Sequence, residues 1–327
     1  MSTALHDVMM VALDVRIWSG RKKLRPEDLT ATGRLPPREL VSLGSKRLCS
    51  PDVLQPFLQV KRRAETRCQA VGVRFARAFA IPRGAAKPLL SSLNSLADQF
   101  QQARTAFLST YDEELARWSA QYPGYERLIA TELLPKAVVA SRFAFGYEVF
   151  AINAIDADGE LADVLAQGGA GNLTLGLVGA LYQEVACESC AFVRHSLTGR
   201  EHVTRKFLRP VRAIRDKLSG LAFLDPDIAP LVGSIDDVLA ALPQVGPIDG
   251  ASLAALRGVI TLLTDAARMR EHGRLLRERS ARDAQRSDGP AAMLRTLAAP
   301  VREGEAPRRE IAVGPGATRA PRADAFW

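Results

Sequence analysis

With 327 residues, of which 47% are apolar, the chain is long enough to bury a sizeable core in one large domain or two ordinary ones. Its opening residues lack the long apolar run of a secretion signal, and no stretch reaches the roughly 20 apolar residues of a membrane-spanning helix. Much of the formal net charge of +8 lies beyond Arg268, where a basic tail either solvates the chain or holds nucleic acid. We therefore expect a cytoplasmic protein without a membrane contact.

The first predicted element is a strand over residues 8–18. Within it, Val11, Leu13, Val15 and Ile17 alternate with small or polar residues, which is the period of a half-buried strand. A connector rich in proline and glycine follows, where regular structure is expected to stop.

Further elements are predicted on both sides of the chain's first long helix. Ser50 is a suitable N-cap, with Pro51 at the first helical position, for a helix that ends near Ala70. Residues 71–81 are predicted to form a second strand, and residues 146–155 a third, weaker one. Strands this far apart in sequence indicate a small sheet that is built from non-local pairings.

Three apolar stripes indicate longer helices, because their members step by three and four residues as in a heptad pattern. The stripes are Leu89, Leu93, Leu96, Phe100, Ala103 and Phe107; Phe207, Val211, Ile214, Leu218 and Leu221; and Leu253, Leu256, Ile260, Leu263 and Ala267. Helices with matching stripes most simply pack on one another, whereas a stripe left free would bind a partner or a second copy of the chain. The predicted fold is mainly α with a small β-sheet (α+β), in which long helices pack as a bundle or a helical hairpin beside a few-stranded N-terminal sheet.

Composition divides the chain into three regions. Residues 1–155 form an N-terminal α+β region, residues 156–283 a helical region, and residues 284–327 a basic tail that is predicted to be disordered. The tail ends in Phe326 and Trp327, and two terminal aromatic residues favour docking into a groove on a partner or on the chain itself. Chance placement of these aromatics is the alternative.

Metal-ligand residue types gather at Cys187, Cys190 and His195. A structural zinc site needs four such ligands in tetrahedral reach, but residues 173–197 are predicted to form one continuous helix on which they do not converge. We favour small helix residues with free thiols and expect no metal and no cofactor. The sequence also lacks a Gly-x-Ser-x-Gly elbow and a His-Glu-x-x-His helix, so we expect a protein that is not an enzyme.

Basic residues surround Trp18 and form a candidate nucleic-acid contact. An exposed aromatic ring beside cations is able to stack on a base while the cations hold a phosphate. The alternative interpretation places Trp18 in the core and the cations on an ordinary solvated face. The basic residues are Arg21, Lys22, Lys23, Arg25, Lys46 and Arg47.

The segments over residues 14–24 and 40–48 resemble an uncharacterised bacterial family, domain of unknown function 3150. Its members are carried on integrative conjugative elements and plasmids, near genes for MoxR-type AAA+ ATPases and von Willebrand A-domain proteins. The resemblance supplies no catalytic residues. It implies a non-enzymatic accessory or adaptor protein that works with such an ATPase and A-domain protein. The alternative is a nucleic-acid-binding protein that acts in recombination, maintenance or defence of a mobile element.

Overall fold

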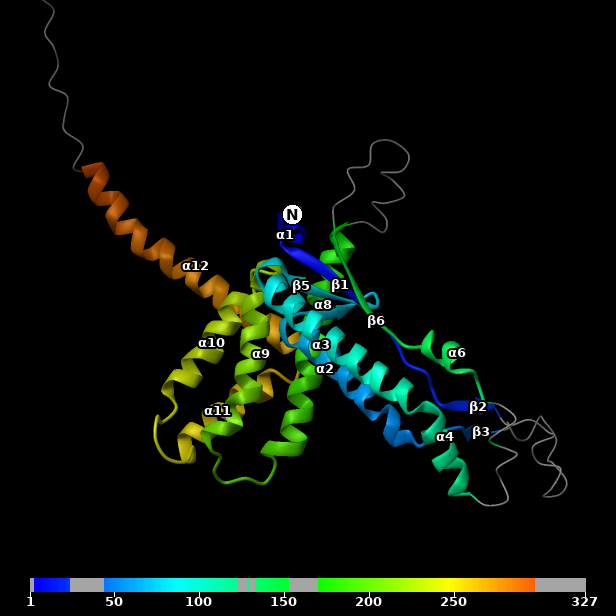
Figure 1. The fold of residues 1–327 in the computed structure, drawn as a ribbon. Coiled ribbons are helices and arrows are strands. Elements are labelled where there is room, and N and C mark those ends of the chain that lie inside the picture. The colour runs from blue at the N-terminus through cyan, green and yellow to red at the C-terminus, as the bar shows by residue number, and fades with distance from the viewer. Residues whose placement is uncertain (1–2, 24–43, 123–128, 130–132, 153–169, 298–327) are drawn as a thin grey trace, which may run out of the picture. The chain divides into compact units, whose positions relative to one another are not determined.

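The computed structural model describes residues 3–23, 44–122, 129, 133–152 and 170–297, with side chains up to residue 284 (Figure 1). The chain divides into two compact units, Met1–Arg279 and Ser280–Trp327. The predicted boundary between residues 155 and 156 lies outside the described residues. The helical residues that follow it, up to Arg279, belong to the same compact unit as the sheet.

A four-stranded antiparallel sheet forms the centre of the first unit, in the order β4-β5-β1-β6. The strands are β1 (Val8–Arg16), β4 (Val73–Phe75), β5 (Ala78–Pro82) and β6 (Ala144–Ala151). The prediction of an α+β fold is confirmed, and so are the strands expected over residues 8–18 and 146–155. A short helix, α1 (Thr3–His6), precedes β1.

The single strand predicted over residues 71–81 is wrong, because this segment folds as a hairpin of β4 and β5. Ala76 and Arg77 make the turn with φ angles of 47° and 68°. Two successive residues with positive φ match the twist of a tight hairpin turn, which an unbroken strand does not contain. The arginines that interrupt the alternation in this segment were the local signal for the turn.

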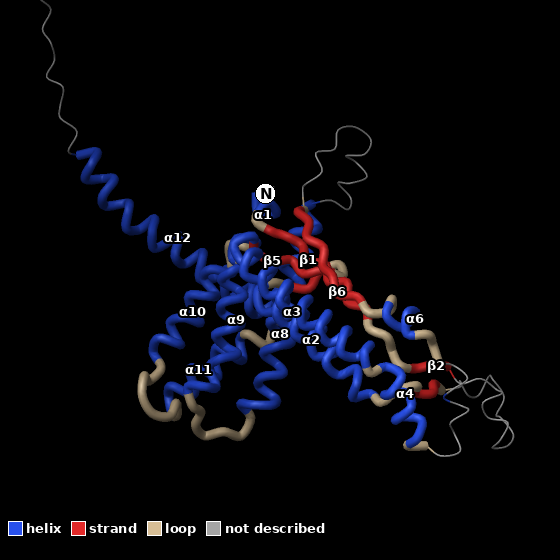
Figure 2. The backbone as a smooth tube through the Cα atoms, viewed as in Figure 1, coloured by secondary structure: helices blue, strands red, loops and turns tan. Residues whose placement is uncertain are grey.

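Helices cover both faces of the sheet (Figure 2). Because side chains alternate along a strand, Val8 and Met10 enter one core, whereas Val11 and its odd-numbered neighbours enter the other. The second of these cores is completed by a 3-10 turn, η2, and four helices. They are η2 (Pro51–Leu54), α2 (Gln55–Val71), α3 (Arg83–Ser109), α4 (Tyr111–Ala120) and α6 (Lys136–Ala140). The expected cap is present, because the Ser50 side chain accepts a hydrogen bond from the Asp52 N–H.

The first core lies against the helices of the second half of the chain. These are α8 (Ala170–Phe192), η3 (Val193–Leu197), η4 (Arg205–Leu208), α9 (Arg209–Gly220), η5 (Ala222–Leu224), α10 (Ile228–Ala241), α11 (Gly250–Leu262) and α12 (Ala266–Leu297). The expectation that the three apolar stripes pack on one another is therefore corrected. The stripe of α3 enters one core, and those of α9 and α11 enter the core on the other face of the sheet.

Helix α12 extends over residues 284–297, which were predicted to belong to the tail. The segment contains several Ala, Leu and Arg residues, which are strong helix formers, and the helix continues through Gly289 and Pro290. Closer to its start, Arg274 forms ion pairs of 2.7 Å with Glu271 and Glu278, three and four residues away. Residues 298–327, with Phe326 and Trp327, lie outside the described part of the chain.

A buried cation joins the helices of the first core to the sheet. The Lys217 side chain on α9 is 3% exposed, and its Nζ lies 2.9 Å from Glu184 and 2.7 Å from Glu188, both on α8. Glu184 also accepts a hydrogen bond from the N–H of Arg74 on β4. A buried ammonium requires such partners, because desolvating an unpaired charge is costly.

Candidate interaction groove between β1 and α2

One edge of β1 has no backbone partner over its second half among the described residues. Strand β5 pairs with β1 only from Val8 to Val11, whereas β6 pairs with it from Met9 to Arg16. Beyond Val11 the chain of β5 turns away into the hairpin with β4. The second half of β1 is therefore an edge strand on the side that faces away from β6.

The hydrogen-bonding direction of each residue on this edge follows from the ladder. The Arg83 N–H donates to the Asp7 carbonyl oxygen at 2.8 Å, in the same register as the pairing of β1 with β5. In an antiparallel ladder every second residue directs its N–H and C=O toward one given neighbour. Leu13 and Val15 therefore point their backbone polar groups toward the free edge.

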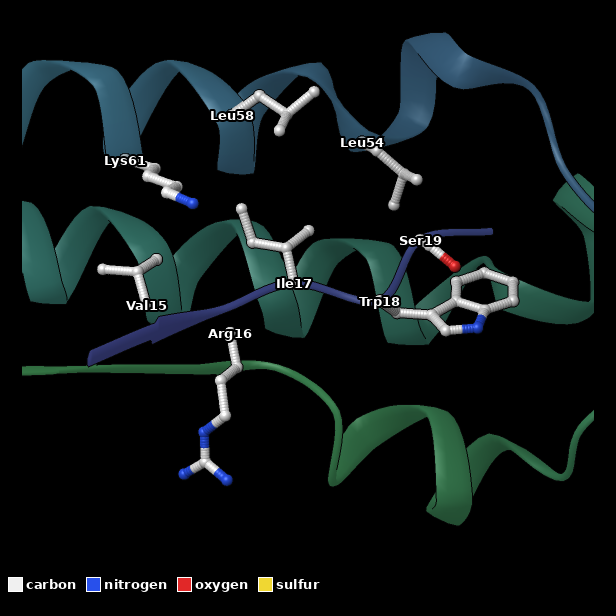
Figure 3. A pocket seen from close by; sticks show the side chains of 8 residues that line it. All are labelled: Val15, Arg16, Ile17, Trp18, Ser19, Leu54, Leu58 and Lys61. Carbon is white, nitrogen blue, oxygen red and sulfur yellow. The ribbon is translucent and has the colours of Figure 1, made fainter. Parts of the chain in front are cut away.

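Helix α2 runs beside this edge and leaves a groove of about 450 Å³ (Figure 3). Val15 at the end of β1 and Ile17 just after it project toward α2, Leu54 projects toward them from η2, and Leu58 lines the groove from α2. Leu58 is 39% exposed, which leaves part of the apolar wall open to solvent. An accessible groove with apolar walls is typical of a binding surface.

The charged side chains that line the groove, Arg16 and Lys61, are positive, and Arg16 also pairs with Asp14 at 3.5 Å. Figure 3 shows the Lys61 ammonium directed into the groove, whereas the Arg16 side chain points away from α2. A smaller pocket of about 140 Å³ adjoins the groove at Leu54 and is lined by Arg21 and Arg47. Among the described residues that line the two pockets, none is acidic.

Trp18 lies in the core at the end of the groove. Its side chain is 2% exposed, and its ring centroid lies 6.2 Å from that of Phe107 and 6.0 Å from that of Tyr111. A ring in this position is not available to stack on a base. Of the two interpretations of Trp18, the exposed stacking ring is therefore wrong, and the core residue is what the structure contains.

The basic residues near Trp18 are brought together by a two-stranded ribbon of β2 (Arg21–Lys23) and β3 (Ser45–Arg47). The register places Arg21 opposite Arg47, and Lys22 opposite Lys46. Arg21, Lys23 and Arg47 are exposed, whereas Lys46 is 6% exposed. Arg25 lies outside the described residues.

Two contacts attach this ribbon to the core. The Leu48 N–H donates to the Gly20 carbonyl at 2.8 Å, and the Trp118 Nε1–H donates to the Arg47 carbonyl at 3.3 Å. Gly20 has a φ of 62°, and a Cβ there would lie 2.7 Å from the Cys49 Sγ, so the close approach of the two strands requires glycine. The turn that follows Trp18 thereby directs Arg21 to the rim of the smaller pocket.

The candidate metal ligands do not converge. Cys187 is exposed on α8, Cys190 donates from its Sγ to the Thr264 carbonyl at 3.6 Å, and His195 lies in η3. Within the described part of the chain, no group of three His, Cys, Asp or Glu side chains is placed to hold a metal ion.

Sequence reasoning missed the helical wall of the groove. Phe57, Val60 and Ala64 are buried on the core face of α2, and Leu58 stands outside that stripe. A leucine on the otherwise polar face of an amphipathic helix was the available signal.

The structure is that of a mainly helical α+β protein with an accessible groove between β1 and α2. The chain belongs to the family described as "Protein of unknown function (DUF3150)", whose model matches residues 5–265. No curated protein and no solved structure matches the chain. Among the described helices, none is by itself long and apolar enough to cross a membrane. One pair of helices is long and apolar enough when taken together, but it is bent by 108°; the pair is Gly250–Leu262 and Ala266–Ala284.

Proposed function

We propose that the protein is a non-enzymatic adaptor that binds a partner protein in the groove between β1 and α2. The observation that carries this proposal is the open apolar wall at Leu58, beside a strand edge without a backbone partner among the described residues. Given the family resemblance, the partner would be an AAA+ (MoxR-like) ATPase or a von Willebrand A-domain protein encoded on the same mobile element.

The chemistry around the groove supports binding rather than catalysis. The thiol of Cys49 lines the smaller pocket that adjoins the groove. Burial, with a further contribution from the Glu114 charge, raises the pKa of Cys49 to about 11. At neutral pH this thiol keeps its proton, and a protonated thiol is a poor nucleophile.

The test is co-purification of the tagged chain with the ATPase and the A-domain protein from the native host, after nuclease treatment. Leu58→Asp places a charge on the apolar wall and is expected to reduce recovery of the partner. Leu275→Asp on α12 is the matched control, because Leu275 is 50% exposed and lies outside the groove. Equal recovery with both variants would refute the groove as the docking surface.

A second candidate function, nucleic-acid binding, is favoured by the ribbon of β2 and β3. Like charges directly opposite each other destabilise a strand pair, and a phosphate between Arg21 and Arg47 would offset this repulsion. Neither guanidinium has an ion pair within the part of the chain that the structure describes. Two-stranded ribbons are known readers of DNA grooves. Such a protein would act in recombination, maintenance or defence of a mobile element.

This candidate predicts affinity for DNA that falls steeply with salt, by about one power of the salt concentration for each phosphate contact. Arg21→Ala/Arg47→Ala should lower the affinity and reduce the salt slope. Arg194→Ala/Arg212→Ala removes the same charge from exposed sites on the helices of the other core and should leave both unchanged. Absent or salt-insensitive binding would exclude this function.

A further inference from the structure

We infer that the groove receives its partner as an extended, acidic segment that adds a strand to the free edge of β1. This inference rests on the proposed adaptor function and specifies the chemistry of the partner. It is carried by the strand edge, the width and lining of the groove, and the sign of the surrounding charge.

The backbone of β1 supplies the first requirement. Leu13 and Val15 direct N–H and C=O groups toward an edge that has no backbone partner among the described residues. An extended peptide forms main-chain hydrogen bonds with such an edge and thereby lengthens the sheet. The peptide would lie beside the second half of β1, in the position that β5 leaves empty, and the order of the four strands would stay the same.

The groove supplies the second requirement, which is room for side chains. An added strand lies about 4.8 Å from its neighbour, and every second side chain points to the same face. On the face toward α2, those side chains would enter the space of about 450 Å³ between Ile17 and Leu58. Apolar residues at alternate positions of the peptide would therefore be buried against α2.

The charges supply the third requirement. Lys61 is directed into the groove, and Arg21 and Arg47 line the pocket that adjoins it. None of the described residues that line the two pockets is acidic, so acidic side chains that enter them from the peptide would be attracted to these cations. Because only every second side chain faces α2, the acidic residues must share the α2-facing positions with the apolar ones, at the two ends of the segment near Lys61 and near Arg21 and Arg47.

Fluorescence polarisation with the labelled heptapeptide Glu-Thr-Val-Thr-Val-Thr-Glu, whose valines and glutamates share one face of a strand, tests this inference. We expect saturable binding, and no binding by the same peptide with lysine in place of glutamate. Val15→Pro removes one of the N–H groups that face the free edge and spares the hydrogen bonds to β6, whereas Val15→Ala removes side-chain atoms and keeps that N–H. Val15→Pro should weaken binding at least about tenfold relative to Val15→Ala.

A second measurement keeps the test decisive if Val15→Pro unfolds the sheet, which its melting curve would reveal. Methylation of alternate peptide nitrogens of the probe removes the donors on one edge and leaves the protein unchanged. One of the two methylated registers should lose binding about tenfold or more. Equal binding of Val15→Pro and Val15→Ala, or of both methylated registers and the parent peptide, would overturn strand addition. Binding of single-stranded oligothymidylate in place of the acidic peptide would overturn it in favour of a nucleic acid.

The adaptor function and strand addition fail in different ways. If the ATPase or A-domain protein co-purifies equally with the unaltered chain and with folded Val15→Pro, the adaptor function stands and strand addition fails. If neither protein co-purifies with the unaltered chain but the acidic peptide binds and Val15→Pro abolishes its binding, the groove accepts a strand and the proposed partners are wrong.

Discussion

Truncation of the Trp18 ring should destabilise the fold strongly. The side chain is 2% exposed and packs against Phe107 and Tyr111. A buried aromatic side chain removes about 150–250 Å² from water, which at about 25 cal/mol per Å² corresponds to roughly 4–6 kcal/mol. The alanine variant keeps the β-carbon, and the neighbouring rings relax partly into the cavity. We therefore expect Trp18→Ala to lower the free energy of unfolding by about 3–5 kcal/mol.

Urea denaturation followed by far-UV circular dichroism measures this change. The midpoint should fall while the slope stays constant, because the surface exposed on unfolding is nearly the same. Trp18→Phe keeps an aromatic ring against Phe107 and should cost clearly less than Trp18→Ala. A loss below about 1 kcal/mol for Trp18→Ala would refute the buried position, since exposed substitutions typically cost within about 0.5 kcal/mol.

Two further predictions concern packing and the thiols. Gly273→Ala should destabilise the protein by about 1–3 kcal/mol, because a Cβ there would collide with a backbone carbonyl at the start of α10. The matched control is Gly258→Ala in α11, where a Cβ has free space. In thermal melts this control should be neutral or slightly stabilising. Burial raises the pKa of Cys49 and of Cys68 from 9.0 to about 11. Between pH 9 and pH 11 these two thiols therefore lose their protons in the unfolded state but keep them in the folded state. The free energy of unfolding should fall as the pH rises through this window. In the native protein Ellman's reagent should modify the exposed Cys187 first and reach Cys49 and Cys68 only after denaturation, and equal native rates for all three thiols would contradict their burial.

Local patterns in the sequence were sufficient for much of the fold. The alternation from Val11 to Ile17 predicted a strand and its two faces, because the period of side chains along a strand is a local property. The Ser50 cap and the stepped apolar residues of α3 predicted helices for the same reason. A family resemblance based on short segments could also be stated from the sequence, and the family model matches residues 5–265.

The candidate site depended on contacts that no local pattern encodes. Trp18 is buried because Phe107 and Tyr111, about ninety residues later in the chain, lie against it. The free edge of β1 exists because β5 turns away after pairing with Val11, and the groove exists because α2 runs beside that edge.

The sequence by itself therefore determined which segments are helices and which are strands, for most of the elements, and which basic residues are available near Trp18. Only the tertiary structure decided which aromatic residue is buried, which strand edge lacks a partner among the described residues, and which cations share a rim. The physical reason is that burial and edge pairing depend on distant segments, whereas the period of a helix or strand depends on neighbouring residues. Lys217 shows the same division, because a lysine on an amphipathic helix is buried only where Glu184 and Glu188 arrive from another helix to pair with it.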